Sequence, residues 1–540
     1  MTKTQRLHLA CETENMAEAT RCLTATLFSQ PANINAPSSA GDFPLHIALA
    51  KGHHDLVRLL LSKGANPNIP AHDGNTPLHI AATHGYHDVV ELLISRGAAV
   101  EQHDSHGVTP LGTILDVGVL HKPRDSALAV LLAARDMIIL LISKGANVNT
   151  TATDGSTPLH WAARKGDKEL IEWLVSKGAE IDRPTKNGIC PLGSALTGPG
   201  TPATRDIIVL LISKGANVNA TDDDGYTALH WAAWRGDAQL ATLLISRNID
   251  INRKSVGHMV DKNDYNPDGY DSKTVTHWKE REGSGHTALY LALTSRREEM
   301  AGWLVSNGAD VNGLDSDGRT LLVDAVVNRR DDRVRFLLSH GANPNITGST
   351  GATPLRHVSS DIPYRHDRTE ALILAGADVN VADRNGNTPL FGVWDGECAR
   401  LLIQKGADVL HHNNVGETAL SIAAAGGRRD VIDVLVDNGV DINANERVMM
   451  CPADADRDVV VRGTPLYFAA LGGNGESVTH LIARGAKVTA DELAELAKIE
   501  ARFKDREGRG TLNLYGRNKI AKFRLAIGVL ACSPTGLRRD

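Results

Sequence analysis

The sequence predicts an all-α solenoid, in which stacked pairs of helices form a superhelix and β-hairpin-like fingers connect successive pairs. The first observation is a position, glycine in most copies, that recurs along the chain, with six of its intervals equal to 33 residues. The second is a motif around Thr-Pro-Leu-His that precedes the glycine in several copies. The third is composition, because 50 glycines and only 4% aromatic residues favour many small cores with frequent turns.

The recurring glycine is expected at the end of the second helix of each repeat. It lies in segments such as LISKGANVN, which occurs at 141–149 and again at 211–219. Asn248 replaces it in one copy, and a degenerate copy around Pro31 begins the series, so that the chain holds about thirteen repeats. The glycines are Gly64, Gly97, Gly145, Gly178, Gly215, Gly308, Gly341, Gly376, Gly406, Gly439 and Gly485.

The repeat at 73–101 illustrates how each element follows from its residues. Thr76 is a good N-cap, and Pro77 suits the first helical position, where its missing N–H costs nothing. The small and apolar residues of 78–82 predict a short first helix that neighbours can approach closely. The apolar residues of 89–94 predict a second helix packed against the first. Gly97 supplies the left-handed stop.

A short β-like finger is expected between the glycine and the next Thr-Pro, as in 148–155. The finger runs into the second motif, which reads DGNTPLHIAA at 73–82, DGSTPLHWAA at 154–163 and DGYTALHWAA at 224–233. These segments resemble the ankyrin repeat, and the resemblance covers roughly residues 5–489. It implies a protein-recognition module that binds partner proteins through its fingers and inner helices, without a cofactor.

The spacing and its interruptions predict the organisation of the chain. We expect a degenerate N-terminal capping repeat, regular repeats with insertions, and a C-terminal end of different character. The predicted segments are 1–38 for the capping repeat, 39–252 for repeats with insertions near 112–136 and 193–206, 253–282 for a polar finger insertion, 283–489 for repeats with an insertion at 444–461, and 490–540 for a capping helix and basic tail.

The predicted binding residues occupy the variable positions of the repeat. The two residues after Ala-Ala and those around the finger glycine are expected to face the concave groove. Trp234, Arg235 and Tyr226 together have the composition of a binding hot spot. Trp161 and Trp231 are instead expected to pack between repeats. The predicted protein-binding residues are Arg164, Lys165, Asp223, Asp224, Tyr226, Trp234, Arg235, Trp278 and His286.

No catalytic, cofactor or metal site is predicted. The histidines of the Thr-Pro-Leu-His motif, which are His46, His79, His160 and His230, are expected to bond backbone across the turn. The sequence from Asp264 to Gly269 resembles the first half of a calcium loop, but Val275 stands where the bidentate acid would be needed. His258, Asp261, Asp264 and His277 match no standard metal spacing.

Charge and cysteine content narrow the class of protein. The net charge of −6 argues against a general polyanion binder, so that no nucleic-acid partner is expected, although residues 501–540 hold 10 basic and 3 acidic residues. Six scattered cysteines, no signal peptide and no apolar stretch long enough to span a bilayer predict a cytoplasmic protein.

The leading hypothesis is an intracellular scaffold or adaptor that binds proteins, and two alternatives stay open. One is an enzyme whose active site is formed by the insertions at 112–136 and 253–282 over the groove. The other is a tether, in which the basic tail contacts acidic surfaces through Lys519, Lys522 and Arg524.

Overall fold

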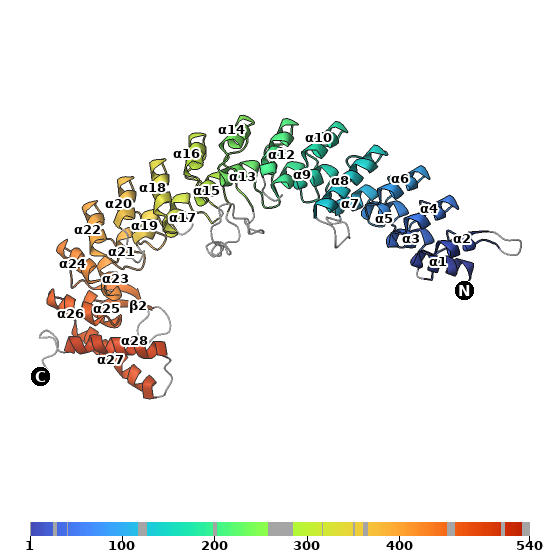
Figure 1. Cartoon of the computed structure of the whole chain (residues 1–540). Coiled ribbons are helices and arrows are strands. Elements are labelled where there is room, and N and C mark those ends of the chain that lie inside the picture. The colour runs from blue at the N-terminus through green and yellow to red at the C-terminus, as the bar shows by residue number, and fades with distance from the viewer. Residues whose placement is uncertain are drawn as a thin grey trace. The chain divides into compact units, whose positions relative to one another are not determined.

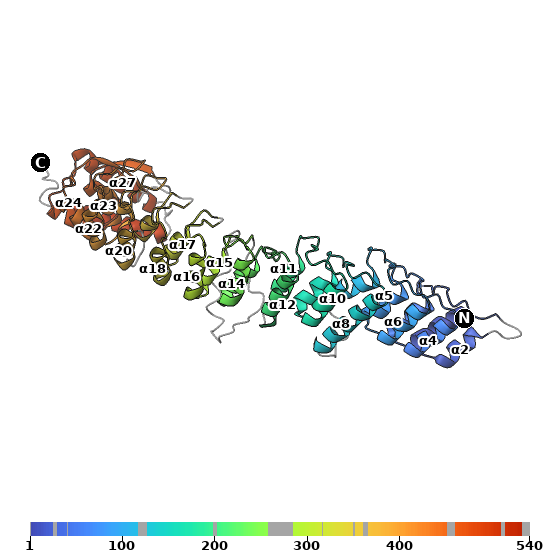
Figure 2. The same cartoon turned by 90° about the horizontal axis from the view of Figure 1, so that it is seen from above.

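The computed structural model describes residues 2–24, 30–39, 41–116, 127–197, 202–256, 285–315, 317–348, 351–359, 366–450, 459–508 and 514–531. The chain forms two compact units, which we call the N-terminal unit, Met1–Glu280, and the C-terminal unit, Arg281–Asp540. Within each unit, pairs of helices follow one another in sequence order (Figures 1 and 2). The predicted all-α solenoid is confirmed.

Each pair in the N-terminal unit consists of an inner helix, which comes first, and an outer helix. The inner helices pack on their neighbours, as α3 does on α5 and α9 does on α11. The inner helices are α1 (Lys3–Thr13), α3 (Pro44–Lys51), α5 (Pro77–Thr83), α7 (Pro110–Asp116), α9 (Pro158–Lys165), α11 (Pro191–Leu196) and α13 (Ala228–Arg235). The outer helices are α2 (Met16–Leu23), α4 (His54–Ser62), α6 (His87–Ser95), α8 (Ala127–Ser143), α10 (Lys168–Ser176), α12 (Pro202–Ser213) and α14 (Ala238–Ser246).

The C-terminal unit repeats this arrangement and adds a hairpin and two longer helices. Its inner helices are α15 (Ala288–Thr294), α17 (Leu321–Val327), α19 (Pro354–Ser359), α21 (Pro389–Gly392), α23 (Ala419–Gly426) and α25 (Pro465–Leu471). Its outer helices are α16 (Glu298–Ser306), α18 (Asp331–Ser339), α20 (His366–Leu374), α22 (Gly396–Gln404), α24 (Arg429–Asp437) and α26 (Gly475–Ala483). The hairpin is β1 (Glu446–Met450) with β2 (Val459–Gly463), and the final helices are α27 (Ala490–Gly508) and α28 (Leu514–Ala531).

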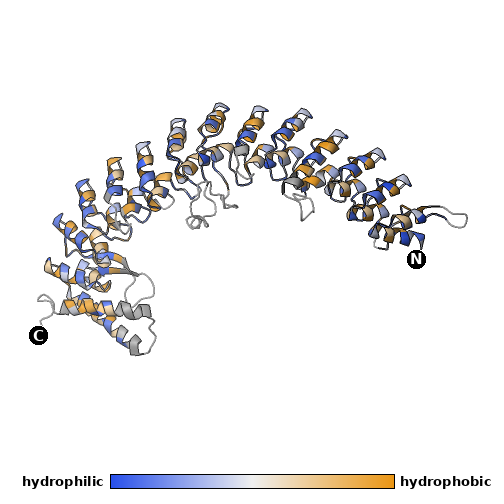
Figure 3. Cartoon of the chain, in the orientation of Figure 1, coloured by the Kyte–Doolittle hydropathy of each residue, from blue (hydrophilic) through white to orange (hydrophobic). Residues whose placement is uncertain are grey.

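A leucine at the second helical position anchors each inner helix from α3 to α25 in the core. From Leu45 in α3 to Leu466 in α25, this leucine is at most 1% exposed in every repeat. Burying each such side chain contributes about 1.5–3 kcal/mol. The helices carry hydrophobic and hydrophilic positions on different faces, as Figure 3 shows. The predicted left-handed stops are also present, with φ of 89° at Gly97 and 66° at Asn248.

A ladder of asparagines links the fingers of neighbouring repeats. The Oδ1 atom of Asn149 accepts the backbone N–H of Glu180 at 2.8 Å, and its Nδ2 donates to the carbonyl of Gly178 at 3.2 Å. Each asparagine therefore holds the helix end of the following repeat. Bonds of the first kind recur at Asn68, Asn219, Asn312, Asn345 and Asn380.

The insertions near 112–136 and 193–206 partly lengthen the outer helices. α8 has 17 residues and α12 has 12, whereas α10 and α14 have nine each. Arg135 and Arg205, on the lengthened helices, reach the N-cap aspartates of the next outer helices, with Nε–Oδ2 distances of 2.9 Å to Asp167 and 3.1 Å to Asp237. These ion pairs join neighbouring outer helices, as the pair of Arg58 with Asp88 does between α4 and α6.

The same two repeats carry glycine where the motif has histidine. A Cβ atom on Gly193 would lie 2.0 Å from the carbonyl oxygen of Thr221, and one on Gly112 would lie 2.8 Å from that of Thr151. The next finger therefore fills the space that an imidazole occupies in other repeats. Only glycine permits this approach.

The insertion at 444–461 extends one finger into an antiparallel hairpin, in which Glu446 pairs with Gly463 and Met450 with Val459. Most of the finger insertion at 253–282 lies outside the described residues.

The C-terminal end differs from the predicted capping helix. A helix, α27, is present where the cap is predicted, but α28 is the helix that packs most extensively on α25 and α26. Phe523 and Ala526 of α28 are fully buried.

Candidate binding surface

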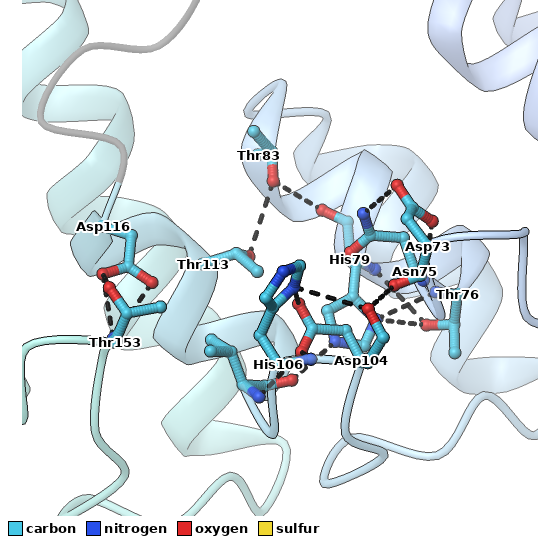
Figure 4. A network of polar contacts seen from close by, with 12 residues as sticks. Asp73, Asn75, Thr76, His79, Thr83, Asp104, His106, Thr113, Asp116 and Thr153 are labelled. Carbon is cyan, nitrogen blue, oxygen red and sulfur yellow. Dashed lines mark hydrogen bonds and ion pairs between the residues drawn. The ribbon is translucent and has the colours of Figure 1, made fainter.

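The motif histidines of α3, α5 and α9 join these helices to the following finger. The backbone N–H of Thr76 donates to Nδ1 of His79 at 3.0 Å, and Nε2 of His79 lies 3.1 Å from the carbonyl oxygen of Val108 (Figure 4). Because Nδ1 accepts, Nε2 carries the hydrogen and donates. His160 repeats the arrangement with Thr157 at 3.1 Å and Ile189 at 2.9 Å.

These imidazoles are structural, as the sequence predicts. Burial lowers the pKa of His46, His79 and His160, since a charged imidazole would be poorly solvated there. Protonated Nδ1 would also oppose the threonine N–H that donates to it. His79 and His160, neutral and with both nitrogens engaged, are not placed to act as a general acid or base.

The C-terminal unit uses other side chains at the histidine position. They are Tyr290, Val323, Arg356, Phe391, Ser421 and Tyr467. The buried carboxylate of Glu446 accepts the hydroxyl of Thr418, and that of Glu492 accepts the backbone N–H of Thr464 at 2.5 Å. Burial raises the pKa of Glu446. Carboxylates from the following segment thus hold the last two caps.

The strongest candidate for recognition lies at the end of α13. The guanidinium carbon of Arg235 lies 5.1 Å from the ring centroid of Trp234 and 5.4 Å from that of Trp231. All three side chains are half-buried. Trp231 is therefore less enclosed than predicted, whereas Trp161, at 3% exposed, packs as predicted.

Tyr226 is not a surface residue, and the prediction that it faces the groove is wrong. It is 6% exposed, and its ring meets that of His230 edge-on with centroids 5.4 Å apart. It directly precedes the Thr227 cap, where its ring covers the imidazole. The sequence offered no sign of this ring contact.

The finger before α13 carries negative charge. Asp223 and Asp224 are exposed at its tip. Asp222 accepts the backbone N–H of Tyr226 at 2.8 Å and that of Asp224 at 3.1 Å. Burial, together with the nearby carboxylates of Asp224 and Asp223, raises the pKa of Asp222 to about 6.

The equivalent end of α9 is basic. Arg164 is half-buried and Lys165 is exposed, at the positions that Trp234 and Arg235 occupy in α13. α11 lies between these two helices and ends at Leu196 with Thr197 as its C-cap. The predicted residues of the N-terminal unit therefore divide into basic helix ends and an acidic finger.

The remaining predicted residues lie elsewhere. Trp278 lies outside the described residues. His286 belongs to the C-terminal unit, where its ring stacks on that of Tyr290 with centroids 4.4 Å apart. Their binding roles stay predictions.

A second arginine–tryptophan pair, in the C-terminal unit, was missed by sequence reasoning. The guanidinium carbon of Arg428 lies 4.1 Å from the ring centroid of Trp394. Two signals could have pointed to it. The repeat around Trp394 is shortened, and Arg428 stands where Asp167 and Asp237 cap their helices.

The described residues cover only part of the segments on which the metal, enzyme and tether hypotheses depend. Across the described ranges, no group of side chains could hold a metal ion, while the half-loop at 264–269 lies outside them. Residues 117–126 and 257–284, on which the enzyme hypothesis depends, also lie outside the described residues.

In the basic tail, Arg524 pairs with Glu500 at 2.8 Å and Lys522 is exposed. None of the helices in the described part of the chain is long and apolar enough to cross a membrane.

Comparison with known families agrees with this architecture. The family description "Ankyrin repeats (3 copies)" matches residues 7–104, 111–185, 264–348 and 362–446, and "Ankyrin repeats (many copies)" matches residues 206–245. No curated protein matches the chain. Because the family matches cover well over half of the 540 residues, and the helix pairs, caps and asparagine ladder recur in step with them, the chain belongs to the ankyrin-repeat family.

Proposed function

We propose that this protein is a scaffold or adaptor that binds a partner protein through the N-terminal unit, across the ends of α9 and α13 and the finger before α13. The observation that carries the proposal is the position of Arg235 against Trp231 and Trp234. Among the described residues, no carboxylate forms an ion pair with Arg235. A half-buried arginine flanked by tryptophans is typical of a binding hot spot.

The charges of this surface indicate how a partner would be oriented. Arg164, Lys165 and Arg235 place positive charge at the helix ends, and Asp223 and Asp224 place negative charge at the finger tip. A complementary partner would present acidic groups to the helix ends and basic groups to the finger. Such an arrangement favours one binding register and speeds association at low salt.

We place the protein in the cytoplasm. Cys11, Cys22 and Cys190 are free thiols, and burial raises the pKa of Cys11 to about 12. Unpaired cysteines in a protein of this size are typical of a reducing compartment.

The test replaces both Trp234 and Arg235 with alanine in the full chain and compares captured native partners by quantitative mass spectrometry. Truncating a hot spot costs about 2 kcal/mol or more, which is roughly a thirtyfold loss of affinity. We therefore expect partners of the wild-type chain to be lost from the variant.

The matched control is Trp173→Ala with Lys177→Ala on outer helix α10, where the ammonium lies 5.6 Å from the indole centroid. This pair has similar chemistry on a different helix row, so its loss should leave the captured partners unchanged. Equal capture by the Trp234/Arg235 variant and the wild type would contradict the proposed site.

A further inference from the structure

The shortest inner helix creates an unusual site in the C-terminal unit. α21 has four residues, whereas α23 has eight, and Val393 after it is extended with φ −65° and ψ 138°. The carbonyl groups at the end of α21 therefore lack the backbone N–H donors that a longer helix would supply. Arg428, from the following repeat, donates through Nη1 to the carbonyl oxygens of Phe391 at 3.0 Å and Val393 at 2.8 Å.

Trp394 covers one side of this guanidinium. The guanidinium carbon lies 4.1 Å from the indole centroid, and Trp394 is 43% exposed. Part of the indole is thus open to solvent, directly beside the guanidinium of Arg428, which is only partly exposed. An exposed aromatic ring beside a fixed arginine offers both apolar contact and charge to an incoming group.

The charge of Arg428 is not balanced by a carboxylate in the described part of the chain. Its polar contacts there are the two carbonyls, and its buried Nε has no hydrogen-bond partner. The neighbouring cation, Arg356, has a carboxylate partner, since its Nε lies 3.4 Å from Oδ2 of Asp383. Burial and the charge of Arg356 lower the pKa of Arg428 to about 10, so the group is still cationic at neutral pH.

We propose that Trp394 and Arg428 form a receptor for an anionic side chain of a bound protein segment. The guanidinium would receive the anion, and the exposed indole would cover the apolar part of the same segment. A carboxylate and a phosphorylated side chain share this chemistry. The site belongs to the C-terminal unit and does not depend on the proposed surface at α13.

The test follows the indole N–H signals of the full chain labelled with ¹⁵N-tryptophan. The probes are three synthetic peptides of the same length and apolar content, centred on Glu-Phe-Glu, Gln-Phe-Gln or phosphoserine-Phe-phosphoserine. Trp394→Phe assigns the signal of Trp394, and the signal of Trp173, beside Lys177, serves as an internal control for general attraction between charges.

We expect the Trp394 signal to shift saturably with the Glu peptide and at least tenfold more weakly with the Gln peptide, while the Trp173 signal stays in place. Stronger binding of the phosphoserine peptide would support the receptor and identify the anion as phosphate. Arg428→Lys keeps the charge but loses the planar fork, so its affinity should fall about tenfold. Arg428→Gln should abolish binding, and thermal unfolding of both variants verifies that they are folded.

Three results would overturn the inference. The Trp394 signal could fail to respond to any of the peptides, it could respond equally to the Glu and Gln peptides, or the folded Arg428→Lys variant could bind the anionic peptides as the wild type does.

Discussion

The α-carbon of Gly193 lies directly against the backbone of Thr221 in the next finger, so closely that a Cβ atom would fall 2.0 Å from the Thr221 carbonyl oxygen. Alanine at Gly193 must therefore push the finger away from α11. We expect Gly193→Ala to lower the free energy of unfolding by about 2 kcal/mol, because backbone atoms must move. Urea unfolding of the full chain, followed by circular dichroism, measures the change.

Gly302→Ala on α16 is the matched control for this substitution. There the nearest atom, Nε2 of His340, would lie 3.6 Å from the new Cβ. Alanine is the better helix former, so this variant should gain roughly 0.5–1 kcal/mol. If Gly193→Ala were as stable as the wild type, the close approach of the Thr221 finger would be refuted.

Acid should weaken the N-terminal unit through its motif histidines. Burial lowers the pKa of His46, His79 and His160 in the folded chain, while the unfolded value is about 6.5. Their contribution to stability is therefore complete above about pH 6.5 and is lost as the pH falls toward the lowered folded values. Hydrogen exchange of the amides of α5 and α9, corrected for intrinsic rates, should accelerate between pH 7 and pH 5.

Glu446, in the hairpin of the C-terminal unit, should give a pH dependence of stability opposite to that of the motif histidines. Burial raises the pKa of Glu446, so its contribution is complete below about pH 4.5 and is lost as the pH rises through the folded value. Amides of β1 and α23 should therefore be better protected at pH 5 than at pH 7. Equal acid sensitivity of α5, α9 and β1 would show that these groups do not govern the response.

Asp222→Asn should stabilise the N-terminal unit at neutral pH. Burial raises the pKa of Asp222 to about 6, so the charged carboxylate is less stable in the folded chain than in the unfolded chain. The free energy of unfolding therefore falls as the pH rises from about 4 through 6. The full shift corresponds to about 3 kcal/mol, which screening by solvent reduces to about 1 kcal/mol. Asparagine keeps the acceptor, as Asn413 does in accepting the N–H of Val415 at 3.0 Å.

Thermal unfolding at pH 7 and pH 4 measures this gain, which should disappear at pH 4. Asp73→Asn is the control of opposite sign. Burial alone would raise the pKa of Asp73, but hydrogen bonds from the backbone and side chain of Asn75 outweigh it and lower the pKa. The folded chain therefore favours the charged carboxylate, and its removal in Asp73→Asn should destabilise the protein at pH 7. A stabilised Asp73→Asn variant, or an unchanged Asp222→Asn variant, would contradict this account.

Much of the architecture could be predicted from the sequence because the decisive interactions are short in range and recur. The Thr76 cap, the buried leucine and the stop at Gly97 each depend on residues within one repeat, and the period then places the next copy. The structural role of His79 was predictable for the same reason. Charge and exposure at Asp223, Asp224 and Lys165 followed from their places outside the apolar pattern.

The row of helix pairs follows from the order of the amino acids alone, since local capping and a regular period suffice to specify each pair. Three contacts become visible only in the folded chain: Tyr226 is buried against His230, α28 packs on the last repeat, and Arg428 contacts Trp394. These contacts depend on how one side chain or helix fills the space left by another, in the last case across a repeat whose inner helix is shortened. Periodicity carries no information about such gaps, because it describes what the repeats share and not where one of them departs.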